Sequence, residues 1–245
     1  MNIFSSKTKR SMKMRKALFL CFNVLIILFI GCIPFLQKHP KEIKGQKITT
    51  SPVIDGKLDD QVWQKARRHT GFVDRNMNNE PAEDQTAIQL VYSDKAIYLA
   101  WYCYDAQPDQ IVTNVIDHQM RPFAEDWISF TIDPSHTHQF TDRVFFMSNP
   151  NGIKFISHPP LHIPLNELPN RWNVGATIVD DGWIVEMEIP WELLNYPQTD
   201  EPIDIGINFD RGHFRTGANT WWSKVRFIED DRNDGHWVNV LPPPK

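Results

Sequence analysis

The stretch NVGATIVDDGWIVEMEIP, residues 173–190, limits the possible folds of this chain more than any other segment. Apolar residues alternate with other residues on both sides of Asp181-Gly182, a dipeptide typical of tight hairpin turns. This period of two predicts a pair of antiparallel strands, each with one face turned toward a core. The residues predicted to face that core are Val174, Ala176, Ile178, Trp183, Val185, Met187 and Ile189. Glu186 and Glu188 fall on the opposite face of the second strand and are predicted to be solvated.

The same alternation recurs through most of the chain after residue 85, between turns rich in Gly, Pro, Asn and Asp. The segments are TAIQLVYS (86–93), AIYLAWYCYD (96–105), DWISFTID (126–133), DRVFFMS (142–148), IKFIS (153–157), IDIGINFDR (203–211) and HWVNVLP (236–242). Short strands at this spacing are typical of an antiparallel β-sandwich. We therefore predict one all-β, jelly-roll-like domain from about residue 48 to 245. Cys103 falls at an inward position and is predicted to be a buried, unreactive thiol.

The first 32 residues have a different composition. A basic stretch, residues 1–16, is followed by the apolar run ALFLCFNVLIILFIGC, which together are typical of an export signal. Because the run ends in Gly31-Cys32, we predict lipidation at Cys32 of a bacterial lipoprotein that faces the periplasm or the cell surface. An uncleaved membrane anchor over residues 17–35, almost long enough to span a bilayer, and soluble secretion are the alternatives. The Lys-rich residues 33–47 are predicted to be a tether.

Charge and motifs exclude several classes of function. The formal net charge is −4 and the chain has no clustered basic face, which argues against nucleic acid as a partner. No Gly-x-Ser-x-Gly, His-Glu-x-x-His or phosphate-loop motif is present. A glycosidase needs two carboxylates about 5–10 Å apart, and no spacing among the acidic residues singles out such a pair. We expect a monomeric binding domain rather than an enzyme.

The segment PVIDGKLDDQVWQKA, residues 52–66, predicts a short helix ahead of the strands. Asp59 or Asp60 can cap its N-terminus, where acidic side chains are favoured. Trp63 and Ala66 lie three residues apart on one helical face and can be buried together. We predict that Trp63 fastens the helix to the sandwich rather than binding a ligand.

The serial order of several motifs is similar to that of a known family. The motifs are VIDGKLDDQVWQKA, YSDKAIYLAWYCYD, EDWISFTIDP, FFMSNPNGIKF, DDGWIVEMEIPWELL and IGINFDR. In this order they resemble the family 9 carbohydrate-binding module, which belongs to the DOMON-like group of β-sandwiches that bind sugar or haem. The resemblance covers the chain after the export segment. It implies a domain that binds glycan. Together with the predicted anchor, this suggests polysaccharide capture or breakdown at the cell surface, beside separate glycoside hydrolases.

The resemblance also implies a set of ligand-binding residues. They are Phe123, Asp126, Asp210, Arg211 and Trp222, with Trp237 as an alternative to Trp222. The aromatic faces would cover the apolar side of a sugar ring, and the charged groups would bind its hydroxyls. Ser129 replaces a glutamate of the family motif, which removes a charged acceptor. A scaffold that has lost sugar binding is therefore one alternative.

Haem and metal ions are further alternatives. In a haem-binding, electron-transferring DOMON-like domain, the axial ligands would come from Met147 with His136, His138, His158 or His162. The stretch HTHQF, residues 136–140, could equally bind a transition metal. A structural calcium would use oxygen ligands in or beside turns, for which the candidates are Asp55, Asp105 and Asp133.

Overall fold

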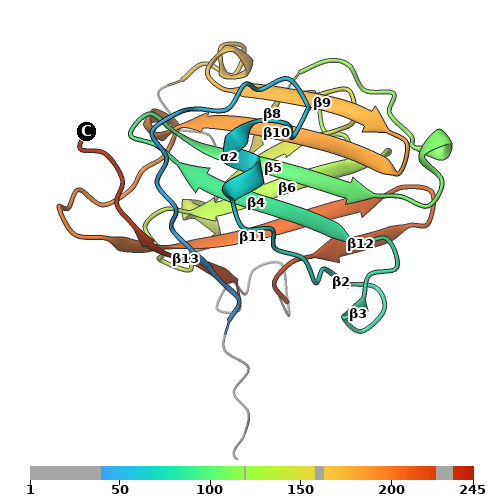
Figure 1. Cartoon of the computed structure of the whole chain (residues 1–245), viewed down its shortest axis with the longest axis horizontal. Coiled ribbons are helices and arrows are strands. Elements are labelled where there is room, and N and C mark those ends of the chain that lie inside the picture. The colour runs from blue at the N-terminus through green and yellow to red at the C-terminus, as the bar shows by residue number, and fades with distance from the viewer. Residues whose placement is uncertain (1–39, 119, 158–162, 225–233) are drawn as a thin grey trace, which may run out of the picture. The chain divides into compact units, whose positions relative to one another are not determined.

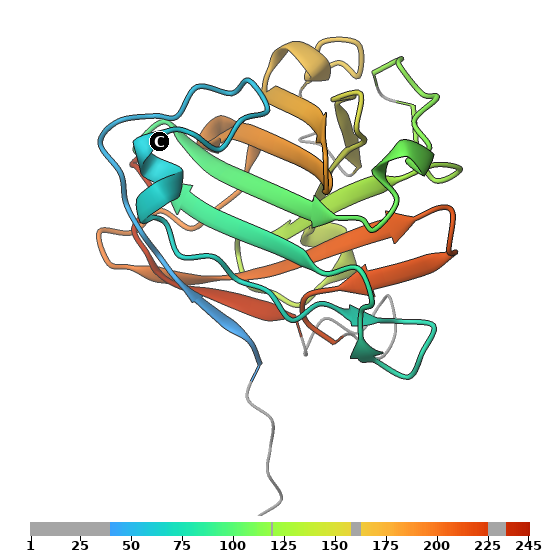
Figure 2. The same ribbon diagram turned by 45° about the vertical axis from the view of Figure 1, so that its right-hand side comes forward.

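Two β-sheets pack face to face over residues 40–245, as Figures 1 and 2 show. This computed structural model describes residues 40–118, 120–157, 163–224 and 234–245. The predicted export segment and Cys32 lie outside those ranges. Within them, no helix is both long enough and apolar enough to cross a membrane. The predicted antiparallel β-sandwich is confirmed.

The larger sheet has the strand order β3-β2-β12-β11-β6-β7-β8, with β13 and β1 joined beside β11. Its long strand β11 pairs with β6 along one edge, and with β13 and then β12 along the other. The bounds are β1 Glu42–Lys44, β2 Val73–Asp74, β3 Glu80–Pro81, β6 Trp127–Asp133, β7 Val144–Ser148, β8 Phe155–Ser157, β11 Ile203–His213, β12 Ala218–Trp221 and β13 Gly235–Val240. β1 pairs in parallel with β13, so the fold begins inside the segment that the sequence suggests is a tether.

The smaller sheet has the order β4-β5-β10-β9 and contains the hairpin from which the sequence interpretation began. Its strands are β4 Thr86–Tyr92, β5 Ala96–Tyr104, β9 Asn173–Val179 and β10 Gly182–Pro190. The turn between β9 and β10 is Asp180-Asp181, one residue earlier than predicted. Gly182 opens β10 with φ 149°, and a Cβ there would collide with the carbonyl oxygen of Cys103 on β5. The close approach of these two strands explains the glycine.

The core lies between the two sheets and follows most of the predicted alternation. The prediction that Ile178 faces the core is wrong: it lies on β9, the edge strand of the smaller sheet, and is 45 % exposed. Phe209 of β11 stacks on Phe130 of β6 with ring centroids 5.3 Å apart. It also meets Trp101 of β5 edge-on at 5.4 Å, which joins the sheets. Trp183 of β10 is fully buried in the same cluster. Burial raises the pKa of Cys103 to about 12, which keeps this thiol protonated and unreactive as predicted.

Helix α2, Gln61–Lys65, lies over the outer face of the smaller sheet (Figures 1 and 2). Trp63 points from it into a second apolar cluster with Val91 and Tyr98 and is only 3 % exposed. The predicted fastening role of Trp63 is confirmed by this position. The predicted carboxylate cap is wrong: Asp60 is the N-cap residue, but its side chain makes no capping hydrogen bond to the helix. Instead its carboxylate accepts a hydrogen bond from the backbone N–H of Val53.

Glu186 is fully buried, so the prediction that it is solvated is wrong. Its carboxylate accepts a 2.6 Å hydrogen bond from the indole N–H of Trp63. It also accepts hydrogen bonds from the backbone N–H groups of the turn at residues 55–57. Burial raises the pKa of Glu186, and these donors partly oppose the rise. One carboxylate on β10 therefore ties both the turn and α2 to the smaller sheet.

Candidate functional site

A groove of about 270 Å³ lies on the outer face of the larger sheet. Ile128 and Phe130 of β6 face the core, so the alternation turns Trp127 and Ser129 outward. The groove is lined by Arg75, Phe123, Trp127, Ser129, Phe145, Met147, Asp210, Asn219, Thr220 and Trp221. It combines several aromatic side chains with a few polar ones, which is the usual composition of a small-molecule site.

One part of the groove is formed by Trp127 and Phe123. The Trp127 indole lies directly over Gly212 of β11, where a Cβ would collide with the ring. Phe123 meets Trp127 edge-on with ring centroids 5.5 Å apart. Because Phe123 is 54 % exposed, part of its surface is open to a ligand.

Trp221 at the end of β12 also lines the groove, together with Arg75 from the segment after β2. The Arg75 guanidinium carbon lies 5.2 Å from the centroid of the Trp221 ring, a cation–π arrangement. The Trp221 indole N–H donates a 2.9 Å hydrogen bond to the Asn79 side-chain oxygen. These contacts fix the ring and hold a cation beside the groove.

Asp210 supplies a carboxyl group to the groove, directly opposite Ser129 in the register of β6 and β11. Burial raises the pKa of Asp210 to about 7, although Arg75 and Arg143 oppose that rise. The groove continues to Asp234, whose carboxylate lies 3.4 Å from the Arg143 guanidinium. Burial likewise raises the pKa of Asp234 to about 7. Asp210 thus provides an acidic group on the strand next to Ser129, the residue that replaces the glutamate of the family motif.

The structure brings two of the five predicted ligand-binding residues, Phe123 and Asp210, into this groove. The other three face the interior, which corrects the prediction that they bind ligand. Asp126 is buried, and its carboxylate accepts the backbone N–H of Val112. Arg211 is buried and donates a 2.7 Å hydrogen bond to the carbonyl oxygen of Tyr104.

Trp222 is 3 % exposed and packs edge-on against Phe209 in the core, with ring centroids 5.6 Å apart. Its suggested alternative, Trp237, is fully buried and stacked on Trp191. Neither indole offers a free face to a sugar. The groove residues that the sequence interpretation missed are Arg75, Trp127, Phe145, Asn219, Thr220 and Trp221. The two tryptophans are direct chain neighbours of residues that it named, Asp126 and Trp222.

Comparisons with known proteins identify the family. The model of the carbohydrate family 9 binding domain-like family matches residues 54–235. This chain belongs to that family. No curated protein matches the chain significantly. Two solved structures of a family 9 carbohydrate-binding module from Caldicellulosiruptor kristjanssonii share the fold. The complex with cellotriose is 17 % identical, covers 84 % of this chain and 95 % of that one, and has a TM-score of 0.61. The complex with glucose is 18 % identical, covers 82 % and 100 %, and has a TM-score of 0.60.

The three calcium candidates of this family 9 domain lie in different surroundings. Asp55 pairs with Lys57 at 3.2 Å, and Asp133 accepts the backbone N–H of His138. Asp105 lies in a group with Asp84 and His213 whose ligand atoms are all within 4.8 Å of one another. Among the described residues, no other three His, Cys, Asp or Glu side chains meet that distance. Asp105 is also 2.7 Å from the Arg215 guanidinium and 3.8 Å from that of Arg211. Two guanidinium groups already balance its charge, so we assign this group to an ion-pair network. Calcium binding stays a prediction.

The candidate haem ligands also lie in different places. Met147 lines the groove of the family 9 domain, whereas His136 and His138 gather beside His236. His158 and His162 lie outside the described residues. No pair of haem ligands is thus brought together within the described ranges.

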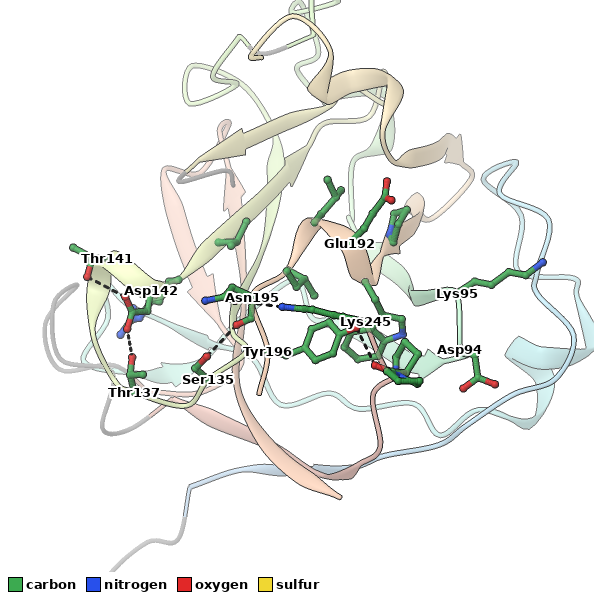
Figure 3. A pocket seen from close by; sticks show the side chains of 18 residues that line it. Asp94, Lys95, Ser135, Thr137, Thr141, Asp142, Glu192, Asn195, Tyr196 and Lys245 are labelled. Carbon is green, nitrogen blue, oxygen red and sulfur yellow. Dashed lines mark hydrogen bonds between the residues drawn. The ribbon is translucent and has the colours of Figure 1, made fainter. Parts of the chain in front are cut away.

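A larger cavity, of about 950 Å³, lies beside Tyr196 and Lys245 and is shown in Figure 3. Its two aromatic rings are occupied by other contacts. The Lys245 ammonium lies 4.7 Å from the Tyr196 ring centroid, and Tyr196 is only 5 % exposed. Trp191 is 2 % exposed and donates its indole N–H to the carbonyl oxygen of Ser93. A sugar ring would find no open aromatic face there, so the outer-face groove is the better candidate site of the family 9 domain.

Proposed function

We propose that this family 9 domain binds carbohydrate in the outer-face groove, without catalysing a reaction. The observation that carries the proposal is the placement of Phe123 and Trp127 beside a carboxyl group and a guanidinium group. The aromatic surfaces suit the apolar side of a pyranose ring, and Asp210 and Arg75 suit its hydroxyls. Charge-assisted hydrogen bonds of this kind orient a polar ligand strongly. Two structures of similar fold are complexes with cellotriose and with glucose, which supports the same ligand class.

A glycan screen tests the proposal. The full chain would be applied to an array of neutral and acidic oligosaccharides, with Asp210→Asn as the groove variant. We expect the wild type to bind a defined set of glycans and the variant to bind the same set more weakly. If the folded wild type binds no glycan, we attribute the loss of sugar binding to Ser129, which replaces the family glutamate. A protein-interaction role then becomes the better account.

The affinity for sugar should rise as the pH increases from about 6 to about 8. The pKa of Asp210 lies at about 7, so this carboxyl ionises in that interval. A carboxylate accepts a hydroxyl hydrogen bond about 1 kcal/mol more strongly than a neutral acceptor does, which corresponds to about fivefold in affinity. Calorimetric titrations at several pH values would measure the profile. Asp210→Asn should flatten it.

Asp234→Asn is the matched control, because Asp234 also titrates near 7 but is paired with Arg143. The pH dependence should survive in this variant. A profile unchanged in Asp210→Asn and lost in Asp234→Asn would contradict the assignment of Asp210 as the hydroxyl acceptor.

The proposal includes export and attachment to a membrane, where the domain would capture polysaccharide beside glycoside hydrolases. This part rests on the basic segment, the apolar run and the Gly31-Cys32 junction in the sequence. Cys32→Ala should abolish the incorporation of a labelled fatty acid and release the protein from the membrane fraction. Cys21→Ala, inside the apolar run, is the control and should keep the label. A wild-type chain that takes up no fatty acid and retains residues 1–31 would contradict lipidation.

A further inference from the structure

Three histidine side chains gather on the outer face of the larger sheet, beyond the end of the groove. The His136 and His138 ring centroids are 4.6 Å apart, and those of His136 and His236 are 4.7 Å apart. Ser129 of the groove and Asp133 beside the histidines point to the same face of β6, four residues or about 13 Å apart. The cluster is therefore a separate feature of the same surface.

The strand register builds this cluster. Gly206 of β11 lies between Asp133 of β6 on one side and His236 of β13 on the other. Because Gly206 has no side chain, the His136 ring can lie over it. A Cβ at this position would be 3.4 Å from the His136 ring and 3.2 Å from the Asp133 side chain. Asp204, two residues earlier on β11, faces the same side and acts on His136 electrostatically.

The backbone around the histidines is held in an unusual conformation. His136 has φ 51° and His138 has φ 59°, in the left-handed region that few residues other than glycine adopt. The Asp133 carboxylate fixes the turn by accepting a 2.8 Å hydrogen bond from the backbone N–H of His138. Strained residues of this kind cluster at ligand sites, where the surrounding structure holds them in place.

Two polar atoms of the cluster are buried without a partner. Neither Nε2 of His136 nor Oδ1 of Asp133 has a hydrogen-bond partner among the described residues. A buried polar atom without a partner is unfavourable, so a ligand that satisfies it is stabilised. An imidazole nitrogen and a carboxylate oxygen are the kinds of atom that coordinate a metal ion.

We propose that His136, His138 and His236, with the Asp133 carboxylate, bind a first-row transition metal ion of the Zn²⁺ type. Imidazole nitrogens with one carboxylate favour such ions over Ca²⁺, which prefers oxygen ligands. Two imidazoles that share a tetrahedral ion at about 2.0–2.1 Å have ring centres roughly 5 Å apart, close to the separations found here. The rings are inclined by 55° and 79°. No three ligand atoms of these four residues lie within 4.8 Å of one another, as those of Asp84, Asp105 and His213 do, so metal binding requires the side chains to rotate until their nitrogens point at one position.

Metal titration of the full chain, without sugar, tests the site. After chelator treatment and dialysis, we expect calorimetry to show one Zn²⁺ bound per chain, with no competition from Ca²⁺. His136→Asn and His236→Gln should each weaken Zn²⁺ binding at least about tenfold, as loss of a ligand implies. Asparagine is chosen at His136 because it tolerates a positive φ. His118→Gln, an exposed histidine outside the cluster, is the matched control and should bind Zn²⁺ as the wild type does.

Co²⁺ provides a readout that does not depend on the variants. Bound to the wild type, it should give the intense visible absorption of a four-coordinate ion, and Zn²⁺ should displace it. The proposal is overturned if the chelator-treated wild type binds no Zn²⁺ in the titration. It is equally overturned if added Co²⁺ shows only the weak visible absorption of the hydrated ion. It is also overturned if His136→Asn and His236→Gln bind Zn²⁺ as tightly as His118→Gln does. Thermal melts without metal would show that each variant is folded.

Discussion

Trp63→Ala should lower the free energy of unfolding by about 3–5 kcal/mol, the usual cost of truncating a buried aromatic residue to alanine. The Trp63 indole is 3 % exposed and fills the space between α2 and the outer face of the smaller sheet. Its truncation would also remove the 2.6 Å hydrogen bond to the buried Glu186 carboxylate. Equilibrium urea unfolding of the full chain, followed by circular dichroism, would measure the loss.

Val53→Ala is the control for this measurement, because Val53 belongs to the same N-terminal segment but is 63 % exposed. Its free energy of unfolding should stay within about 0.5 kcal/mol of the wild-type value. Equal urea midpoints for Trp63→Ala and the wild type would show that α2 contributes little to the stability of the sandwich.

Phe123→Ala and Trp127→Ala should each weaken sugar binding about tenfold. Burying about 60 Å² of apolar surface on one aromatic ring is worth roughly 1.5 kcal/mol at 25 cal/mol per Å². That free energy corresponds to about tenfold in the dissociation constant. Since the two rings are in contact at 5.5 Å, the effects in the double variant need not add. Calorimetric titration with a glycan found in the screen would measure them.

Thermal melts would distinguish residues of the groove from residues of the core. Phe123 is 54 % exposed, so Phe123→Ala should melt close to the wild type. Trp222→Ala should do the reverse, with about 3–5 kcal/mol of lost stability and an unchanged affinity in its folded state. The groove is misplaced if Phe123→Ala melts far below the wild type and binds sugar as tightly.

Much of the fold could be predicted because period-two alternation reports directly which side chains face a core. The hairpin of β9 and β10 and the inward positions of β6 follow from it. The pairing of β1 with β13 could not be predicted, since Glu42–Lys44 is a polar strand of three residues. The burial of Glu186 also escaped prediction, because an outward glutamate becomes buried only once residues 52–66 dock over it.

The candidate site was predicted within one residue but often on the wrong face. Successive side chains of a strand point to opposite sides, so Asp210 can reach the groove while Arg211 faces the core. The same rule separates Trp221 from Trp222. Because DWISFTID places Ile128, Phe130 and Ile132 inward, its alternation already turns Trp127 outward.

Arg75 is a different case. It reaches the groove from a segment far away in the sequence, next to β2, which pairs with β12. That pairing involves strands of only a few residues, which leave no clear periodicity. No local pattern in the sequence therefore indicates that Arg75 belongs with Trp221.

A crystal structure of the chain with a bound glycan from the screen tests the central claim most directly. We expect one sugar ring against Phe123 and Trp127, with its hydroxyls within hydrogen-bond distance of Asp210 and Arg75. A sugar bound instead in the larger cavity beside Tyr196 and Lys245, with the outer-face groove empty, would contradict the account.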